Sequence, residues 1–137
     1  MQIAHLTDLH IRPRGKPAYR VVEVNMMLAR ALATLKSLDP LPDALVLSGD
    51  LTDCGLAEEY ALLRSLLEGL GMPVYLIPGN HDRREALREV FGDWPTFGDD
   101  PQFIDFAADL GPVRIVGVDT VVPGHGHGAL CAHRLQR

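Results

Sequence analysis

The sequence ALVLSGDLTD at residues 44–53 decides the fold, because a short apolar run is followed at once by Gly49 and the acidic residue Asp50. Residues 44–47 form too short a run for a buried helix, and they predict a buried strand. Two other runs have the same form, an apolar stretch that ends close to a polar side chain. They are residues 3–6, also predicted to be a buried strand, which lead to Asp8, and residues 74–77, which lead to Asn80.

Segments with helical periodicity separate and follow these strands. Apolar residues recur every three or four positions in residues 20–38, which predicts an amphipathic helix that ends at Asp39-Pro40. Further helices are predicted for residues 57–70 and, more briefly, for residues 84–91. Strands that alternate with helices of this length predict an α/β fold, with a mostly parallel sheet flanked by helices.

The rest of the chain adds loops and a hairpin. Residues 11–19 and 93–101 lack periodicity and predict loops. Two apolar segments, residues 103–107 and 113–118, flank Gly111-Pro112 and predict a β-hairpin.

Composition limits the kind of protein. With 137 residues, 47% of them hydrophobic and 23% charged, residues 1–137 are expected to form a single globular domain. The net charge of -5 disfavours a nucleic-acid polymer or an acidic membrane as partner. We see no signal peptide and no apolar run of the roughly 18 to 20 residues that span a bilayer. The two cysteines, Cys54 and Cys131, suggest neither a disulfide framework nor a metal knuckle, so we expect a cytoplasmic protein in which both are bystanders.

Polar residues follow each strand of the predicted sheet. Because the carboxyl ends of parallel strands share one edge, Asp8, Asp50 and Asn80 should gather there, with His10 two residues after Asp8. This mixture of oxygen and nitrogen donors suits Mn, Fe, Co or Zn better than Ca. Two clustered carboxylates repel each other unless they are neutralised, and a carboxylate that bridges two metals about 3.5 to 4 Å apart would achieve this.

Each of these residues also has an ordinary structural interpretation. An aspartate after a strand is often a turn former or a helix cap, and Asn80 after Gly79 suits a turn in the left-handed conformation. The coincidence of three such positions favours the metal site. His5, within the first strand, is interpreted as a packed, hydrogen-bonded core residue.

Three motifs resemble the signatures of the calcineurin-like metallophosphoesterase superfamily, in the same order and at similar spacings. They are Asp8-Leu9-His10, then Gly49-Asp50-Leu51-Thr52-Asp53, then Gly79-Asn80-His81-Asp82. Within the superfamily, other features resemble the class III cyclic nucleotide phosphodiesterases and their glycerophosphodiesterase relatives. These features are Arg12, Gly15 and Tyr19, then Leu76-Ile77-Pro78, and then Val118-Asp119-Thr120. The resemblance implies the N-terminal part of an α/β/β/α sandwich, because it covers about the first half of such a protein.

The resemblance also implies a role for each site residue. Asp8 and His10 would bind the first of two divalent metal ions, Asp50 would bridge the pair, and Asn80 would bind the second. His81 would face the phosphate, where it could stabilise charge or protonate the leaving oxygen.

Three residues near these motifs could support the site. Asp53 is a candidate to orient the His81 ring, and equally a candidate N-cap of the helix that begins near residue 57. Arg12 or Arg14 could assist at the rim of the site, although solvated loop cations are the more ordinary interpretation.

The implied reaction is hydrolysis of a small phosphodiester, such as a cyclic nucleotide or a glycerophosphodiester. The two metals would lower the pKa of a shared water, and the resulting hydroxide would attack phosphorus in line with the leaving group. A nuclease or phosphoprotein phosphatase on the same core is a second hypothesis, which the acidic balance and the lack of a basic stripe disfavour. A third is a catalytically incomplete metal-binding fragment, or a homo-oligomer that exchanges segments.

The sequence departs from the family pattern in its last third. The family adds a His-His pair, absent here, and a Gly-His-x-His motif. Residues 124–127, with His125 and His127, match that motif without a strand before them, which favours a surface or substrate-contacting loop over metal ligands. Residues near His133 resemble the start of a helix that Arg137 interrupts, so we expect a truncated domain. With too few ligands for the second metal, we expect this chain alone to be a poor catalyst.

Overall fold

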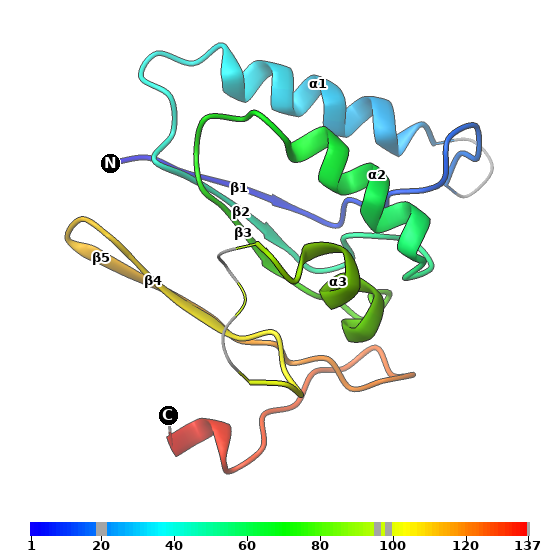
Figure 1. Ribbon diagram of the computed structural model, residues 1–137, viewed down its shortest axis with the longest axis vertical. Helices are drawn as coiled ribbons and strands as arrows, with labels where there is room; N and C mark the ends of the chain where they lie inside the picture. The colour runs from blue at the N-terminus through cyan, green and yellow to red at the C-terminus, as the bar shows by residue number, and fades with distance from the viewer. Residues whose placement is uncertain (19–21, 95–96, 98–99, 137) are drawn as a thin grey trace.

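The computed structural model describes residues 1–18, 22–94, 97 and 100–136, which form a parallel sheet with helices packed against it (Figure 1). Strands β1 (Ile3–Thr7), β2 (Ala44–Ser48) and β3 (Val74–Ile77) pair in parallel in the order β1-β2-β3. Helices α1 (Val24–Lys36) and α2 (Ala57–Leu67) connect them, and α3 (Arg84–Phe91) follows β3. The predicted α/β fold is confirmed.

The two faces of the sheet pack against different partners because side chains alternate along a strand. In β2, Leu45 and Leu47 belong to the main core with residues of α1, α2 and α3, whereas Ala44 faces the other side. The main core contains Leu28 and Leu32 of α1, Tyr60, Leu63 and Leu67 of α2, Leu87 and Phe91 of α3, and Val74 and Leu76 of β3.

A β-hairpin covers part of the opposite face. It consists of β4 (Phe106–Leu110) and β5 (Val113–Gly117), and Phe106 stacks on Tyr75 of β3 with ring centroids 5.1 Å apart. The hairpin was predicted, but β4 begins three residues later than expected. Leu110 pairs with Val113 directly across the two-residue turn, and Phe106 pairs with Gly117 at the other end of the hairpin. The register set by the turn therefore places β4 three residues further along the chain.

The prediction of a buried first strand was wrong for one face of β1. Ala4 and Leu6 pack against the main core, but Ile3, His5 and Thr7 are exposed. β1 is an edge strand, and the cluster beneath the sheet contains residues of β2, β3 and the hairpin. His5 is therefore hydrogen-bonded as predicted, with Nε2 2.6 Å from Ser48 Oγ, but it is not a core residue.

Several helix ends also differ from the predictions. The expected start of α1 at Arg20, like Tyr19, lies outside the described residues; the helix ends at Lys36 and leaves Leu38 exposed. α2 stops at Leu67, shortly before Gly69, whose φ of +68° does not continue a right-handed helix. Near His133 the structure has a short 3-10 helix, η1 (Arg134–Gln136). In the part of the chain that the structure describes, no helix combines the length and apolar character needed to cross a membrane.

An ion pair attaches the segment after the hairpin to α3. Arg84, the first residue of α3, donates from Nε and Nη2 to the buried carboxylate of Asp119 at 2.6 and 2.8 Å, and from Nη2 to the carbonyl of Val121 at 2.6 Å. Burial acts to raise the pKa of Asp119, but hydrogen bonds from Arg84 and from two backbone amides outweigh it and lower the pKa.

We expect this pair to make folding stability sensitive to acid. A carboxyl group whose pKa is lower in the folded state stabilises the fold above its unfolded pKa, about 3.9, and this stability is lost as the pH falls through the folded value. The free energy of unfolding should therefore fall more steeply below about pH 4 in the native protein than in Asp119→Asn. Urea unfolding between pH 6 and pH 2 measures this.

Asp109→Asn is the matched control. Its carboxylate also accepts hydrogen bonds from an arginine, Arg114, but its side chain is 63% exposed, so solvent weakens the effect. Equal pH dependence in the native protein and in Asp119→Asn would contradict the prediction.

Candidate metal centre

The loops after β1 and β2 hold the predicted ligands in an uncommon backbone conformation. Asp8, His10 and Asp50 have φ angles of 55°, 45° and 36°, and within the described ranges no other non-glycine residue has a positive φ. Such conformations cost on the order of 1–3 kcal/mol each and persist when the surroundings enforce them. Backbone hydrogen bonds between the two loops do so, from Asp8 N to Gly49 O (3.3 Å) and from His10 N to Asp50 O (2.8 Å).

These three side chains meet at the carboxyl edge of the sheet. One ligand atom of each lies within 4.8 Å of the others, and His10 Nε2 is 3.7 Å from Asp50 Oδ2. Thr7 Oγ1 donates to Asp8 Oδ2 at 2.5 Å and so limits the orientation of that carboxylate. Two carboxylates and one imidazole fit a divalent transition metal, whose charge would offset the repulsion between the carboxylates.

The buried carboxylate of Asp82, for which the sequence predicts no role, joins the loops after β2 and β3. Asp82 accepts hydrogen bonds from the main-chain nitrogens of Leu51 (2.9 Å) and Gly79 (2.8 Å) and from the hydroxyl of Tyr60 (2.8 Å). Thr52 donates to it from both its main-chain nitrogen and its hydroxyl. Asp82 thus fixes Asp50 and Asn80 indirectly, through their neighbours in the chain.

Gly79 lets these two loops approach each other closely. A Cβ atom at this position would overlap both the main-chain nitrogen and Oδ1 of Asp50. The same Oδ1 accepts a hydrogen bond from the main-chain nitrogen of His81 at 2.9 Å. Because Gly79 has no side chain, the loop that carries Asn80 and His81 can lie directly against Asp50.

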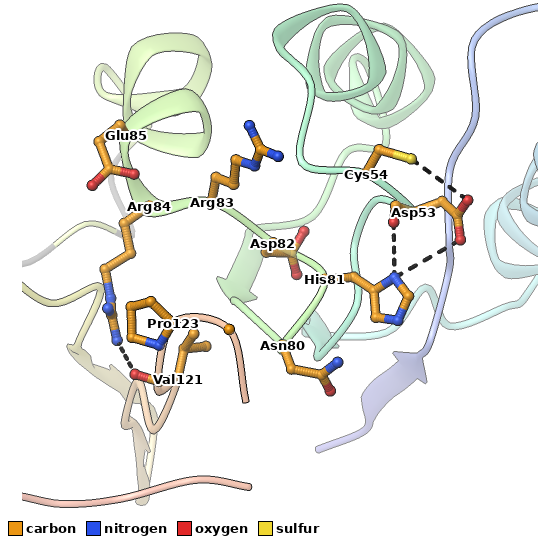
Figure 2. A pocket seen from close by; sticks show the side chains of 11 residues that line it. Asp53, Cys54, Asn80, His81, Asp82, Arg83, Arg84, Glu85, Val121 and Pro123 are labelled. Carbon is orange, nitrogen blue, oxygen red and sulfur yellow. Dashed lines mark hydrogen bonds and ion pairs between the residues drawn. The ribbon is translucent and has the colours of Figure 1, made fainter. Parts of the chain in front are cut away.

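Asn80 and His81 line an open cleft of about 450 Å³ at this edge (Figure 2). The cleft also contacts α3 through Arg84 and the segment after β5 through Val121, which the Arg84–Asp119 pair holds in place. Asn80 is exposed. The structure therefore brings Asn80 to the same edge as the other predicted ligands, on the side of the cleft.

The His81 ring is oriented by a main-chain group. Its Nδ1 lies 2.8 Å from the carbonyl oxygen of Asp53, so Nδ1 carries the hydrogen and Nε2 is left for other partners. This hydrogen bond raises the pKa of His81; burial opposes it, and the charges of Asp50, Asp53 and Asp82 act in the same direction as the hydrogen bond.

The carboxylate of Asp53 lies nearer to His10 than to His81. Its Oδ1 is 3.3 Å from His10 Nδ1 but 3.9 Å from His81 Nδ1, and the shortest contact between Asp53 and the His81 ring is made by the main-chain carbonyl, not by the carboxylate expected to orient it. Nor is Asp53 the N-cap of α2. Leu56 occupies that position, and the Glu59 carboxylate accepts from its main-chain nitrogen at 3.1 Å.

A second group of donor atoms, from His10, Asp53 and His81, also lies within 4.8 Å. Two observations favour the first group as the ligand set. His81 Nδ1 is already bound to the Asp53 carbonyl, and the φ angles distinguish Asp8, His10 and Asp50. In this arrangement Asp53 would support His10 from behind, as carboxylates often do for metal-binding histidines.

His125 and His127 belong to neither donor group. They are exposed, with ring centroids 5.1 Å apart, and His127 lines a smaller pocket that also contacts Asn80. Neither appears in a cluster of three metal-binding side chains within the described residues. Both side chains therefore lie at the surface, and a contact with substrate stays a prediction.

A parallel sheet with this donor set and cleft at its carboxyl edge defines a metallophosphoesterase type of α/β domain. Comparison with protein families agrees: the model of the calcineurin-like phosphoesterases matches residues 1–135. The chain belongs to this family.

Individual relatives carry two kinds of name. The chain is similar to a glycerophosphodiester phosphodiesterase GpdQ of Enterobacter lignolyticus (37% identity, 95% of this chain and 47% of the relative) and to a probable GpdQ of Arcobacter nitrofigilis (35%, 98% and 49%). It is also similar to a cAMP/cGMP dual specificity phosphodiesterase of Mycobacterium tuberculosis (33%, 97% and 42%). The chain spans about half the length of these curated relatives.

Proposed function

We propose that this protein is a metal-dependent phosphodiesterase that hydrolyses a small diester. The observation that carries the proposal is the meeting of Asp8, His10 and Asp50 beside a cleft that contains His81. The names of the relatives support the same reaction class, with glycerophosphodiesters and cyclic nucleotides as the two substrate classes to test.

Four residues of the chain would bind the metal ions. Asp8 and His10 would hold one divalent ion, Asp50 would be shared between two, and Asn80 would contribute to the second. Bound ions of the Mn, Fe, Co or Zn type would supply Lewis acidity and lower the pKa of a water nucleophile. The loops at the sheet edge hold these side chains in place through their left-handed backbone conformations and through the hydrogen bonds to Asp82.

His81 would act on the substrate rather than on the metal. With Nδ1 donating to the Asp53 carbonyl, Nε2 is the ring atom that can interact with a phosphoryl oxygen or protonate a leaving alkoxide. A raised pKa favours the protonated ring, which suits both roles. A diester carries one negative charge, so His81 and the ions can offset it without a cluster of arginines.

We propose that residues 1–137 belong to one metallophosphoesterase domain of a cytoplasmic protein that acts on small molecules, not on nucleic-acid polymers or membranes, and that can form homo-oligomers. The net charge of -5 supports the exclusion of polyanionic partners.

The experiment compares a diester with a monoester. Rates on bis(p-nitrophenyl) phosphate and on p-nitrophenyl phosphate are measured with added Mn²⁺ and with a chelator. For a protein that carries the full set of metal ligands, we expect Mn²⁺-dependent hydrolysis of the diester, suppression by the chelator, and at most slow hydrolysis of the monoester. For residues 1–137 alone, which supply few ligands for a second ion, we expect much slower hydrolysis. Metal binding without hydrolysis of either compound by the protein with the full ligand set would favour a metal-binding chain without catalytic activity and overturn the proposal.

A further inference from the structure

We infer that Arg12 is a positioning residue, held by buried Glu59, which fixes the Asp53 carboxylate behind His10. This inference rests on the proposed function, because it gives the His10 ring its orientation as a metal ligand. The sequence suggested Arg12 as a cation at the rim of the site, but Arg12 is not among the residues that line the cleft.

The guanidinium of Arg12 is directed at groups behind the site. Its Nη1 lies 3.0 Å from Asp53 Oδ2, 3.4 Å from Glu59 Oε1 and 2.7 Å from Cys54 Sγ. Cys54, expected to be a bystander, is therefore part of this contact. Three acceptors around one nitrogen leave the guanidinium little freedom to turn toward a substrate.

Both ends of Arg12 are attached to secondary structure. Its main-chain nitrogen donates to Asn25 Oδ1 at 3.2 Å, and Asn25 Nδ2 donates to its carbonyl at 2.8 Å, which ties the backbone to α1. The Glu59 side chain is fully buried in α2, and its other oxygen, Oε2, accepts from the main-chain nitrogens of Cys54 and Leu56. The carboxylate that holds Arg12 is thus itself fixed.

Asp53 transmits this rigidity to His10. With Oδ2 bound to Arg12, the carboxylate cannot rotate without losing an ion pair, so Oδ1 stays 3.3 Å from His10 Nδ1. His10 Nδ1 thus faces the Asp53 carboxylate, and Nε2 lies on the side of Asp50, 3.7 Å from its Oδ2. A carboxylate behind a metal-binding imidazole fixes its tautomer and ring orientation, and loss of such a partner typically weakens metal binding 10- to 100-fold.

The first test compares Arg12→Gln with Arg14→Gln by titration calorimetry with Mn²⁺. Arg14 belongs to the same loop, is exposed, and lies away from the cleft, so it is the matched control. We expect Mn²⁺ to bind Arg12→Gln about 10- to 100-fold more weakly than the native protein, and Arg14→Gln to bind it unchanged. Arg12→Lys should lie between the two, because lysine keeps the charge for Glu59 but lacks the planar fork.

A double-mutant cycle shows whether Arg12 acts through Asp53. Asp53→Asn alone should weaken Mn²⁺ binding to a similar degree, and adding Arg12→Gln to it should cause little further loss. An independent, full additional loss in the double variant would overturn the inference, since Arg12 would then act by another route. Thermal melting of each variant with a chelator separates weaker binding from unfolding caused by an unpaired buried Glu59.

A metal-free readout completes the test. In the chelated native protein, long-range ¹H–¹⁵N spectra should show His10 with its hydrogen fixed on Nδ1, and Arg12→Gln should show a mixture of tautomers. An unchanged tautomer, or unchanged Mn²⁺ affinity, would overturn the positioning role. If the native protein shows the Nδ1 tautomer but binds no Mn²⁺, the proposed function fails. The positioning of His10 by Arg12 is then decided by whether Arg12→Gln changes the tautomer.

Discussion

Asp50→Asn is expected to abolish tight metal binding while leaving the fold intact. Asparagine has nearly the same shape and its Oδ1 can still accept the hydrogen bond from the His81 main chain, so the loop geometry should be preserved. A neutral amide cannot bridge two cations as a carboxylate does. The loss of affinity should therefore exceed the 10- to 100-fold effect expected of an outer-shell partner.

Metal analysis after dialysis, together with thermal melting in a chelator, measures both parts of this result. Asp93→Asn is a suitable control, because Asp93 pairs with Arg64 at the surface and is not part of either donor group. Unchanged metal content in Asp50→Asn would remove Asp50 from the bridging role.

In a protein that carries the full set of metal ligands, His81→Ala is expected to lower turnover by roughly 10²- to 10⁴-fold with metal content nearly intact. The reason is its geometry: Nδ1 is committed to the Asp53 carbonyl, which leaves Nε2 for the substrate, and the side chain lines the cleft. Steady-state kinetics on bis(p-nitrophenyl) phosphate at saturating Mn²⁺, with metal analysis of the same samples, provides the measurement.

His133→Ala is the control for removing a histidine, since His133 is exposed, does not line the cleft and lies outside both donor groups. Loss of metal in parallel with loss of activity in His81→Ala would show that His81 is a ligand. It would then favour the group formed by His10, Asp53 and His81 over the one formed by Asp8, His10 and Asp50.

The sequence was sufficient to predict the parallel sheet and the edge at which the site lies, because strand length and the polar residue after each strand are local features. The α/β fold and the hairpin are confirmed. The burial of β1 was not predictable in this way. Whether Ile3 and His5 are covered depends on how far the hairpin extends beneath the sheet, which local patterns do not encode.

The contacts that hold the site residues in place could not be predicted from the sequence. Asp82 stood within a motif, yet its role depends on donors from Leu51, Tyr60 and Gly79, which come from different segments. The same holds for the contact between Arg12 and Glu59, which are 47 positions apart. A buried charge at a helical position, such as Glu59 in an otherwise apolar face, was the available signal that a partner must exist.

The left-handed backbone at Asp8, His10 and Asp50 implies a conflict between robustness and activity. At each of these positions glycine would relieve the backbone, so an engineering campaign that selected for heat resistance alone would accept glycine there and lose the donor groups. Consensus or library designs on this scaffold should therefore hold these three positions fixed and seek stability elsewhere, for example on the exposed face of β1.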